Sequence, residues 1–400
     1  MRTLEKLQEF LKSDHVEVRR KAVTMLGEIK SENGVPFLLT ALKDRDEIVR
    51  AIAIFSIGEV GSENAVAALL PFLQDKDANI RSAAAIALGK IGSHKAEDAL
   101  LLALKDSDDH VRGCVASALA KIGSEKAEKL LIKLRHAEKP EVRRKAIMAL
   151  KEIPSEQVHQ TLIEALEDHD ESVRNSAAIA IGELGLRAAE RKLIQIVANE
   201  TPDVQMSILF ALGEMHAEQS VDVVTRLLKS SHKGVAQQAA SALSKIRSDK
   251  ALSGLIAVLE EGNPELRWSV VEALGELRRE EAIASLVKIL HDPDEDVRWS
   301  VARALGSIPS RKSAPPLIQM LHDPNMQVRS IAANALGRLG LHEGVEPLLN
   351  ALNDPESEVA WSAAEALTEI GDPEALKQLE QLLPRMDPDL AERFKGRLKR

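Results

Sequence analysis

Apolar residues recur along this 400-residue chain with a period of 31, which no insertion or deletion interrupts. One column holds the apolar residue of a recurring Val-Arg pair: Val18, Val49, Ile80, Val111, Val142, Val173, Val204, Val235, Leu266, Val297, Val328 and Val359. Four positions later the residue is small or branched, and eight positions later it is Leu or Ile. Positions spaced by four and eight share one face of an α-helix, so each Val-Arg segment is predicted to be helical.

A second helix is predicted in each unit, because a second apolar column repeats at the same period. It consists of Leu38, Leu69, Leu100, Leu131, Leu162, Leu193, Val224, Leu255, Leu286, Leu317, Leu348 and Leu379. Breakers such as Gly61, Gly92 and Pro154 stand between the two helices and indicate a helix end. Aspartates precede the Val-Arg helix, and we expect their carboxylates to cap its free N–H groups: Asp44, Asp75, Asp106, Asp168, Asp292, Asp323 and Asp354.

Repetition of a helix–turn–helix unit predicts an all-α solenoid. Two helices cannot bury their own apolar face, but stacked pairs can. We therefore expect one continuous domain over 1–400, with a capping helix at 1–12, twelve repeats at 13–384 and a second capping helix at 385–400. Polar residues at the ends, Gln8 and Glu380, stand in a column where most repeats carry Leu or Ile, as capped solenoids require.

Composition narrows the function. The chain has 53 Lys+Arg, 62 Asp+Glu and a net charge of −9, which argues against a nucleic-acid-coating protein. Cys114 is the only cysteine, so the chain cannot form an internal disulfide or a Cys-based zinc site. No apolar run reaches the length of a membrane span, and the first residues lack the apolar stretch of a signal peptide. A cytoplasmic protein with no membrane partner is the expectation.

Units such as Asp292-Pro-Asp-Glu-Asp-Val-Arg-Trp-Ser-Val-Ala-Arg-Ala-Leu-Gly306 resemble the HEAT-like repeats of the phycobilisome (PBS) lyase family. The resemblance covers about residues 1–398 and implies an armadillo/HEAT-like superhelix whose Val-Arg helices line the concave surface. It is specific for fold and weak for function, because many unrelated proteins use this repeat.

Arginine follows the apolar anchor in most units, as in Arg19, Arg298 and Arg329. Such a column could bind phosphates, or it could pair with the aspartates of neighbouring turns. Its regularity favours the structural interpretation, because a binding site rarely needs the same contact in every unit. The family resemblance also implies that the Asp–Arg ladder is structural.

The variable positions two and six residues after the anchor predict two partner surfaces on the concave face. The first is an apolar ridge, made of Phe55, Ile86, Met148, Ile179, Met206 and Phe210. The second combines aromatic and polar residues, namely Trp268, Trp299, Trp361, Glu272, Arg303, Asn334 and Glu365. Apolar patches rimmed by polar groups mark partner sites, and Trp and Arg are frequent interface anchors. Alternatively, the tryptophans pack over arginine stems and the ridge packs between helices.

Catalytic and metal chemistry is not indicated. His136, His291 and His322 share a column, but no cysteine lies near them and the aspartates already fit helix starts, so we expect no metal and no cofactor. Cys114 is interpreted as a buried or unreactive thiol and not as a nucleophile. The basic residues between Lys121 and Lys145 alternate with glutamates, which favours a solvated, salt-bridged face over a site for an acidic partner.

The leading interpretation is a non-enzymatic scaffold or adaptor that binds a protein or peptide on its concave face, with a monomer favoured. Two alternatives remain. The family resemblance implies a bilin lyase-type, chromophore-handling subunit. A HEAT-like DNA glycosylase would need a basic concave face and a catalytic aspartate, and the concave columns carry few basic residues.

Overall fold

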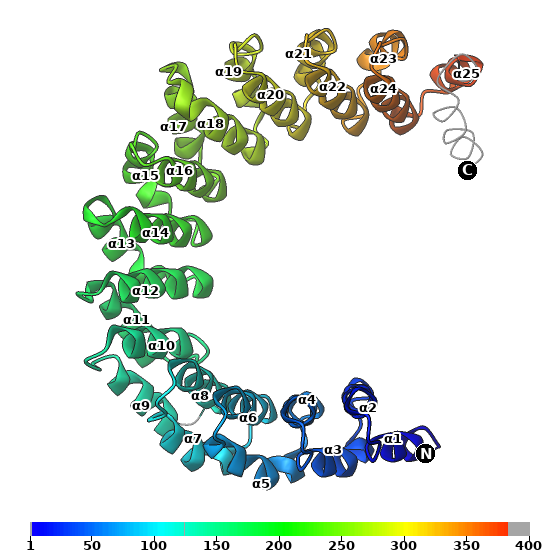
Figure 1. Ribbon diagram of the computed structural model, residues 1–400. Coiled ribbons are helices and arrows are strands. Elements are labelled where there is room, and N and C mark those ends of the chain that lie inside the picture. The colour runs from blue at the N-terminus through cyan, green and yellow to red at the C-terminus, as the bar shows by residue number, and fades with distance from the viewer. Residues whose placement is uncertain (1, 124, 383–400) are drawn as a thin grey trace. The chain divides into compact units, whose positions relative to one another are not determined.

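The computed structural model describes residues 2–123 and 125–382, and this part of the chain contains α-helices, short 3₁₀ turns and no strand (Figure 1). The predicted α-solenoid is confirmed: helices alternate between two stacked rows throughout. The helices form two compact units, Met1–Ala189 and Glu190–Arg400. A single continuous domain with the predicted repeat boundaries stays a prediction.

In the first unit, the row of Val-Arg helices stacks in chain order, each helix on the next. This row comprises α2 (Val16–Glu28), α4 (Glu47–Val60), α6 (Ala78–Ile91), α8 (Asp109–Ile122), α10 (Pro140–Leu150) and α12 (Glu171–Leu184). The second row comprises α3 (Val35–Ala41), α5 (Val66–Leu69), α7 (Glu97–Ala103), α9 (Glu125–Leu134) and α11 (Glu156–Glu164). An additional helix, α1 (Arg2–Phe10), packs on α2 and buries Leu7.

The second unit repeats this arrangement. Its Val-Arg helices are α14 (Pro202–Glu214), α16 (Lys233–Ile246), α18 (Pro264–Leu277), α20 (Glu295–Ser307), α22 (Met326–Arg338) and α24 (Ser357–Ile370). Its second row comprises α13 (Glu190–Ile196), α15 (Val221–Leu227), α17 (Asp249–Glu260), α19 (Ile283–Val287), α21 (Ala314–Met320), α23 (Val345–Ala351) and α25 (Pro373–Leu382). The predicted capping helix at 385–400 lies outside the described residues.

Short 3₁₀ turns lead into or finish many second-row helices. They are η1 (Glu32–Gly34), η2 (Glu63–Ala65), η3 (Leu70–Gln74), η4 (His94–Ala96), η5 (Ala165–Glu167), η6 (Arg187–Ala189), η7 (Val197–Asn199), η8 (Glu218–Ser220), η9 (Glu280–Ala282), η10 (Arg311–Ser313) and η11 (His342–Gly344). None of the helices in the described part of the chain is both long and apolar enough to span a bilayer.

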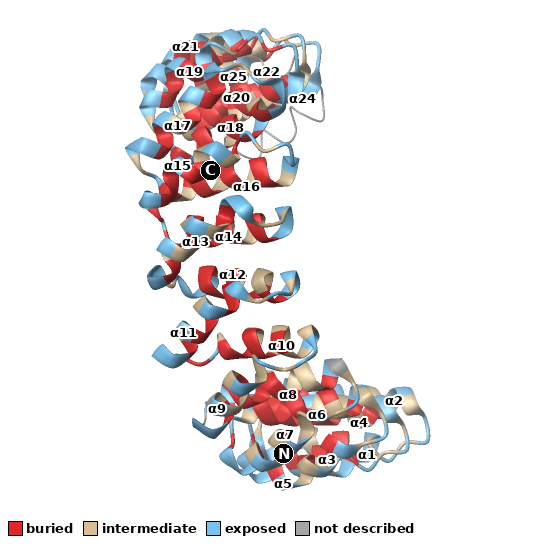
Figure 2. Ribbon diagram, turned by 90° about the vertical axis from the view of Figure 1, so that its left-hand side faces the viewer, coloured by how far each residue is buried: buried red, intermediate tan, exposed pale blue. Residues whose placement is uncertain are grey.

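The core lies where the predicted columns meet. In the second repeat the anchor Val49, the small residue Ala53 and Ile57 are each 0% exposed. The second-row column is equally buried, for example at Leu69 and Leu255. Figure 2 shows buried residues along the helices, and exposed residues both on the helices and at the turns. Small aliphatic side chains therefore account for the core, as the scarcity of aromatics indicated.

Glycines nine residues after the anchor let successive Val-Arg helices approach closely. A Cβ placed on Gly89 would lie 2.7 Å from the Cα of Ala118 and 2.8 Å from its Cβ. The same approach recurs between Gly58 and Ala87 and between Gly275 and Ala304. The helix spacing is thus set partly by a glycine column, in addition to the small residues expected four positions after the anchor.

The predicted capping aspartates do not cap the helices directly. The residue that caps α4 is Asp46, which accepts a hydrogen bond from the Val49 N–H, whereas Asp44 lies two residues earlier and accepts from the Asp46 N–H. The prediction was wrong by two residues because both positions are acidic in this repeat and either could form a turn. The predicted glycine ends are confirmed: Gly61 and Gly92 close α4 and α6 with φ of 75° and 70°.

The Asp44 column instead receives the arginine ladder. Arg298 donates from Nε and Nη2 to both carboxylate oxygens of Asp323 in the next repeat, at 2.7 and 3.0 Å. Its Nη1 donates to the backbone carbonyl of Asp292 in its own repeat, at 2.8 Å. Equivalent bidentate pairs join Arg19 to Asp44, Arg81 to Asp106, Arg143 to Asp168 and Arg329 to Asp354. These side chains are largely buried, which confirms the structural interpretation of the column.

Candidate functional site

The open face of the Val-Arg helices in the second unit carries three neighbouring cavities. One cavity of about 530 Å³ lies over α16, α18 and α20, where Trp268 and Trp299 both line it. A second, of about 440 Å³, extends over α14, α16 and α18, from Met206 to Glu276, and shares Trp268 with the first. Trp268 therefore stands at the boundary of two cavities, and 43% of its surface is exposed.

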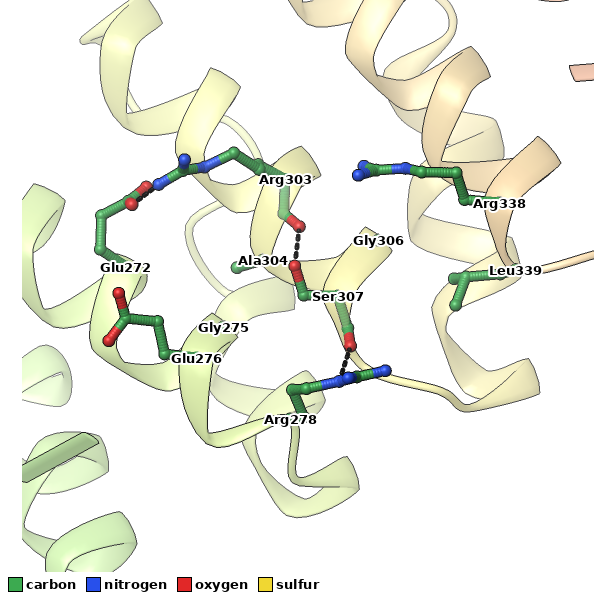
Figure 3. Close-up of a pocket in the computed structure, with 10 residues that line it drawn as sticks. All are labelled: Glu272, Gly275, Glu276, Arg278, Arg303, Ala304, Gly306, Ser307, Arg338 and Leu339. Atoms are coloured by element: carbon green, nitrogen blue, oxygen red, sulfur yellow. Dashed lines mark hydrogen bonds and ion pairs between the residues drawn. The ribbon is translucent and has the colours of Figure 1, made fainter. Parts of the chain in front are cut away.

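A third cavity of about 510 Å³ lies towards the C-terminal ends of α18, α20 and α22 (Figure 3). It shares Glu272 and Glu276 with the second cavity. Arg278 ends α18 in a left-handed conformation, with φ of 56°, and its Nε donates to the Ser307 carbonyl at 2.9 Å. Arg338 extends from the end of α22, and none of the described residues forms a hydrogen bond or ion pair with it.

Two of the predicted polar residues bind each other. Arg303 on α20 forms an ion pair with Glu272 on α18, and its guanidinium lies over the Trp299 ring, 5.1 Å from the centroid. The side chain of Glu272 is only 15% exposed, and its Oε1 is buried without a hydrogen-bond partner in the described part of the chain. The arginine that lies over Trp299 thus comes from the same helix and not from a neighbouring one, and the partner role of Trp299 stays a prediction.

The remaining residues of the tryptophan group lie apart from these cavities. Trp361 and Glu365 are half-buried on α24, and Asn334 is half-buried on α22. Asn334 donates to the hydroxyl of Ser362 at 3.3 Å. The structure therefore brings Trp268, Trp299, Glu272 and Arg303 together with Met206, but it does not bring Trp361, Asn334 or Glu365 into the same cavities.

The predicted apolar ridge is accessible in varying degree. In the first unit Phe55 is 51% and Ile86 38% exposed, while Met148 and Ile179 are half-buried. In the second unit Met206 and Phe210 are half-buried. Its role as a partner surface stays a prediction.

Cations of the chain cover aromatic rings on Val-Arg helices in each unit. The ammonium of Lys90 lies 4.4 Å from the centre of the Phe55 ring, and that of Lys245 lies 5.3 Å from Phe210. Lys90 also binds Glu59, and Lys245 binds Glu214. The two phenylalanines are therefore part of cation–carboxylate networks, in addition to being apolar.

Three basic residues between Lys121 and Lys145 form ion pairs with acidic side chains. Lys126 pairs with Asp98, Lys129 with Glu125 at 2.5 Å, and Arg135 with Glu164 at 2.9 Å. These contacts support the interpretation as a solvated, paired face.

Candidate chemistry is sparse among the described residues. No group of three or more His, Cys, Asp or Glu side chains there could hold a metal ion. Cys114 is half-buried, with its Sγ 3.7 Å from the His110 Nε2, and burial raises the pKa of its thiol. Burial, together with Arg112 and Arg144, lowers the pKa of the neighbouring Lys145. A raised thiol pKa disfavours the thiolate that nucleophilic chemistry needs.

Several cavity-lining residues were missed by the sequence prediction. Glu265 and Asp296 directly precede the apolar anchors of α18 and α20, and Glu276 lies ten residues after one. The prediction considered only positions after the anchor on the middle of each helix. A usable signal existed, because helix-start residues of adjacent units lie side by side in any stacked repeat.

Comparisons with known proteins support the architecture. The chain resembles yeast importin-β (Kap95p), with 14% identity, a TM-score of 0.68 and coverage of 96% of this chain and 63% of that one. It also resembles Kap121p in the complex with Pho4p, with 16% identity, a TM-score of 0.61 and coverage of 97% and 50%. The chain thus spans about half to two thirds of these structures, and identities this low show the fold alone. Curated protein sequences yield no match.

The sequence itself matches a family model along nearly its whole length. The model of HEAT repeats matches residues 4–76, 35–120, 66–134, 127–204, 190–262, 252–325 and 314–393. These matches overlap in series, as expected where each stretch contains more than one of the repeated helix pairs seen in the structure. The chain belongs to the HEAT-repeat family.

Proposed function

We propose that this protein is a non-enzymatic scaffold or adaptor that binds a protein or peptide on the open face of its Val-Arg helices. The observation that carries the proposal is that different columns of the repeat have different surroundings. The ladder and core columns are buried in intrachain contacts, whereas Trp268, Met206 and their neighbours line open cavities. Large aromatic side chains beside cavities are typical anchors for a partner.

Fold-level likeness agrees with this proposal. Kap121p, which has a similar fold, is solved in complexes with Pho4p, Nup53p and Ste12p. A solenoid of this type can therefore hold a protein partner. A concave curvature of the binding face, a monomeric state and a cytoplasmic location belong to the same proposal.

Affinity purification from the native host, followed by mass spectrometry, tests the function. A variant with Trp268, Trp299 and Trp361 all changed to Ala should remain folded but lose the partner that the unmodified chain recovers. The matched control changes Leu102 and Val287 to Ala, since these side chains are 66% and 40% exposed on second-row helices α7 and α19. Equal recovery by the triple variant and the control would refute the proposal.

Membership of the PBS lyase branch of HEAT-like proteins is a finer proposal that rests on the repeat sequence alone. Mixing the chain with a bilin tests it, because binding would change the visible absorbance of the chromophore. An unchanged spectrum would remove the chromophore-handling alternative while leaving the scaffold proposal intact.

A further inference from the structure

The aromatic rings on the open face differ in whether the chain supplies a cation to them. Phe55, Phe210 and Trp299 each carry a lysine or arginine of the chain within 5.3 Å of the ring centre. Trp268 lies in the same unit as Trp299, and no residue in the described part of the chain provides its ring with a cation or its indole N–H with an acceptor. Indole is the best ring for a cation, and 43% of the surface of Trp268 is exposed.

Carboxylates surround this open ring. We call the two cavities that share Trp268 the Trp268 trough. Its acidic lining residues are Glu265, Glu272, Glu276, Asp294 and Asp296, against a single basic residue, Lys233. Arg303 neutralises part of the charge of Glu272 from the adjoining cavity. The remaining excess is negative in a site with exposed aromatic surface.

Part of this acidity has a local structural reason. Asp294 caps α20 by accepting from the Asp296 N–H at 2.9 Å, and Glu276 accepts from the Ser244 hydroxyl at 2.6 Å. Glu265 and Asp296 lie in first helical turns, where the helix dipole favours negative charge. Nevertheless, no described residue forms an ion pair with Glu265 or Asp296.

One carboxylate oxygen that lines the trough is buried and unpaired. Glu272 Oε1 is shielded from solvent yet has no hydrogen-bond partner in the described residues, although Arg303 pairs with the same carboxylate. Buried carboxylate oxygens are normally satisfied, and leaving one unpaired is costly.

We propose that the Trp268 trough binds an arginine-containing, basic segment of a protein partner, with a guanidinium stacked on Trp268 and the acidic lining around it. The arrangement at Trp299 is the internal precedent, because there the chain's own Arg303 lies over an indole while it binds Glu272. Arginine suits the site better than lysine, since its planar group stacks on an indole and donates to a carboxylate at the same time. This inference rests on the proposed function and specifies the partner's chemistry.

Fluorescence anisotropy with the full chain and a labelled peptide tests the inference. The probe is a short peptide with three arginines separated by Gly-Ser pairs, and its counterparts carry citrulline, lysine or glutamate instead of arginine. We expect saturable binding of the arginine peptide, binding weaker by about tenfold for the isosteric but neutral citrulline peptide, and no binding of the glutamate peptide. Equal binding of the arginine and citrulline peptides, or no saturable binding up to millimolar peptide, would overturn the inference.

Three variants assign the binding to the trough. W268A should weaken binding of the arginine peptide by about tenfold. W361A is the same change in the same column but outside the trough, and it should leave the affinity for the peptide unchanged. The double variant W299F/W361F retains Trp268 as the only tryptophan, so its emission should change when the peptide binds. Unaltered affinity in W268A would refute the assignment.

The outcome separates this inference from the scaffold proposal. If the tryptophan-dependent partner is recovered from the host but the arginine peptide does not bind, the partner is not recognised through a basic segment and the scaffold proposal stands. If the triple tryptophan variant recovers the same partners as the control, the scaffold proposal fails, whatever the peptide does.

Discussion

Replacing Gly89 by Ala tests whether the glycine column sets the distance between successive Val-Arg helices. The new Cβ would lie 2.7 Å from the Cα and 2.8 Å from the Cβ of Ala118 on α8. Carbon atoms in contact prefer separations of about 3.5–4.0 Å, so α6 and α8 would have to separate by roughly 1 Å. Neither obstructing atom belongs to a side chain that can rotate away.

The expected size follows from two opposing effects. Overpacking of a well-packed interface costs about 1–3 kcal/mol, and the rigid backbone obstacle here places the cost in the upper half of that range. Alanine stabilises a helix relative to glycine by about 1 kcal/mol, which offsets part of this cost. We therefore expect G89A to lower the free energy of unfolding by roughly 1–2 kcal/mol.

Gly113 provides the matched control within α8. A Cβ there would lie 3.2 Å from Cδ and 3.3 Å from Cε of Lys145, a flexible side chain that can move. G113A should therefore gain the helix propensity without the clash and stabilise the protein by up to about 1 kcal/mol. Changing Ala118 to Gly in the G89A background should restore only part of the stability, because the Ala118 Cα remains.

Urea unfolding followed by circular dichroism measures these differences, and hydrogen exchange localises them. Because a solenoid is stabilised by nearest-neighbour interfaces, the loss of protection in G89A should be greatest for amides of α6 and α8. An unfolding midpoint for G89A equal to or above that of the unmodified chain would show that the column does not limit the helix spacing.

Three further predictions concern titratable groups. Hydrogen bonds from Arg329 hold the pKa of Asp354 below its ordinary value of 3.8. The stability that this pair contributes is therefore present above that pH and is lost on acidification. Thermal unfolding from pH 7 to 2 should show a difference in stability between the unmodified chain and R329Q that shrinks below about pH 4. Lys90 and Lys30 lower the pKa of Glu59 to about 2, and carbon-detected NMR titration should show this pKa rise in K90M, with unchanged titration refuting the pairing. Because burial raises the pKa of the Cys114 thiol, it should react with a disulfide reagent at pH 8 much more slowly in the folded chain than in urea, and equal rates would contradict its burial.

The fold was predictable because one local rule repeats. The columns of Val49, Ala53 and Ile57 define a helix face, and their recurrence at a fixed period requires stacking. The Arg–Asp ladder was predictable for the same reason. The position of the cap was not, because Asp44 and Asp46 are both good turn residues, and only the structure shows that Asp46 accepts from the helix while Asp44 accepts from Arg19 of the preceding repeat.

The site was predictable in outline only. Column position identified Trp268 and Trp299 as surface residues on one face, but both have the same place in the repeat and the same flanking sequence, Arg-Trp-Ser-Val. What distinguishes them is the next contact: Arg303 lies four residues after Trp299, where it reaches both that ring and Glu272, whereas Glu272 itself lies four residues after Trp268. A repeat sequence gives each tryptophan the same surroundings except at such variable positions. Because the residue four positions after Trp299 is Arg303, that indole has a cation of the chain over it. The residue four positions after Trp268 is Glu272, so its indole has none among the described residues. This difference, rather than the number of aromatic residues, makes Trp268 the candidate anchor.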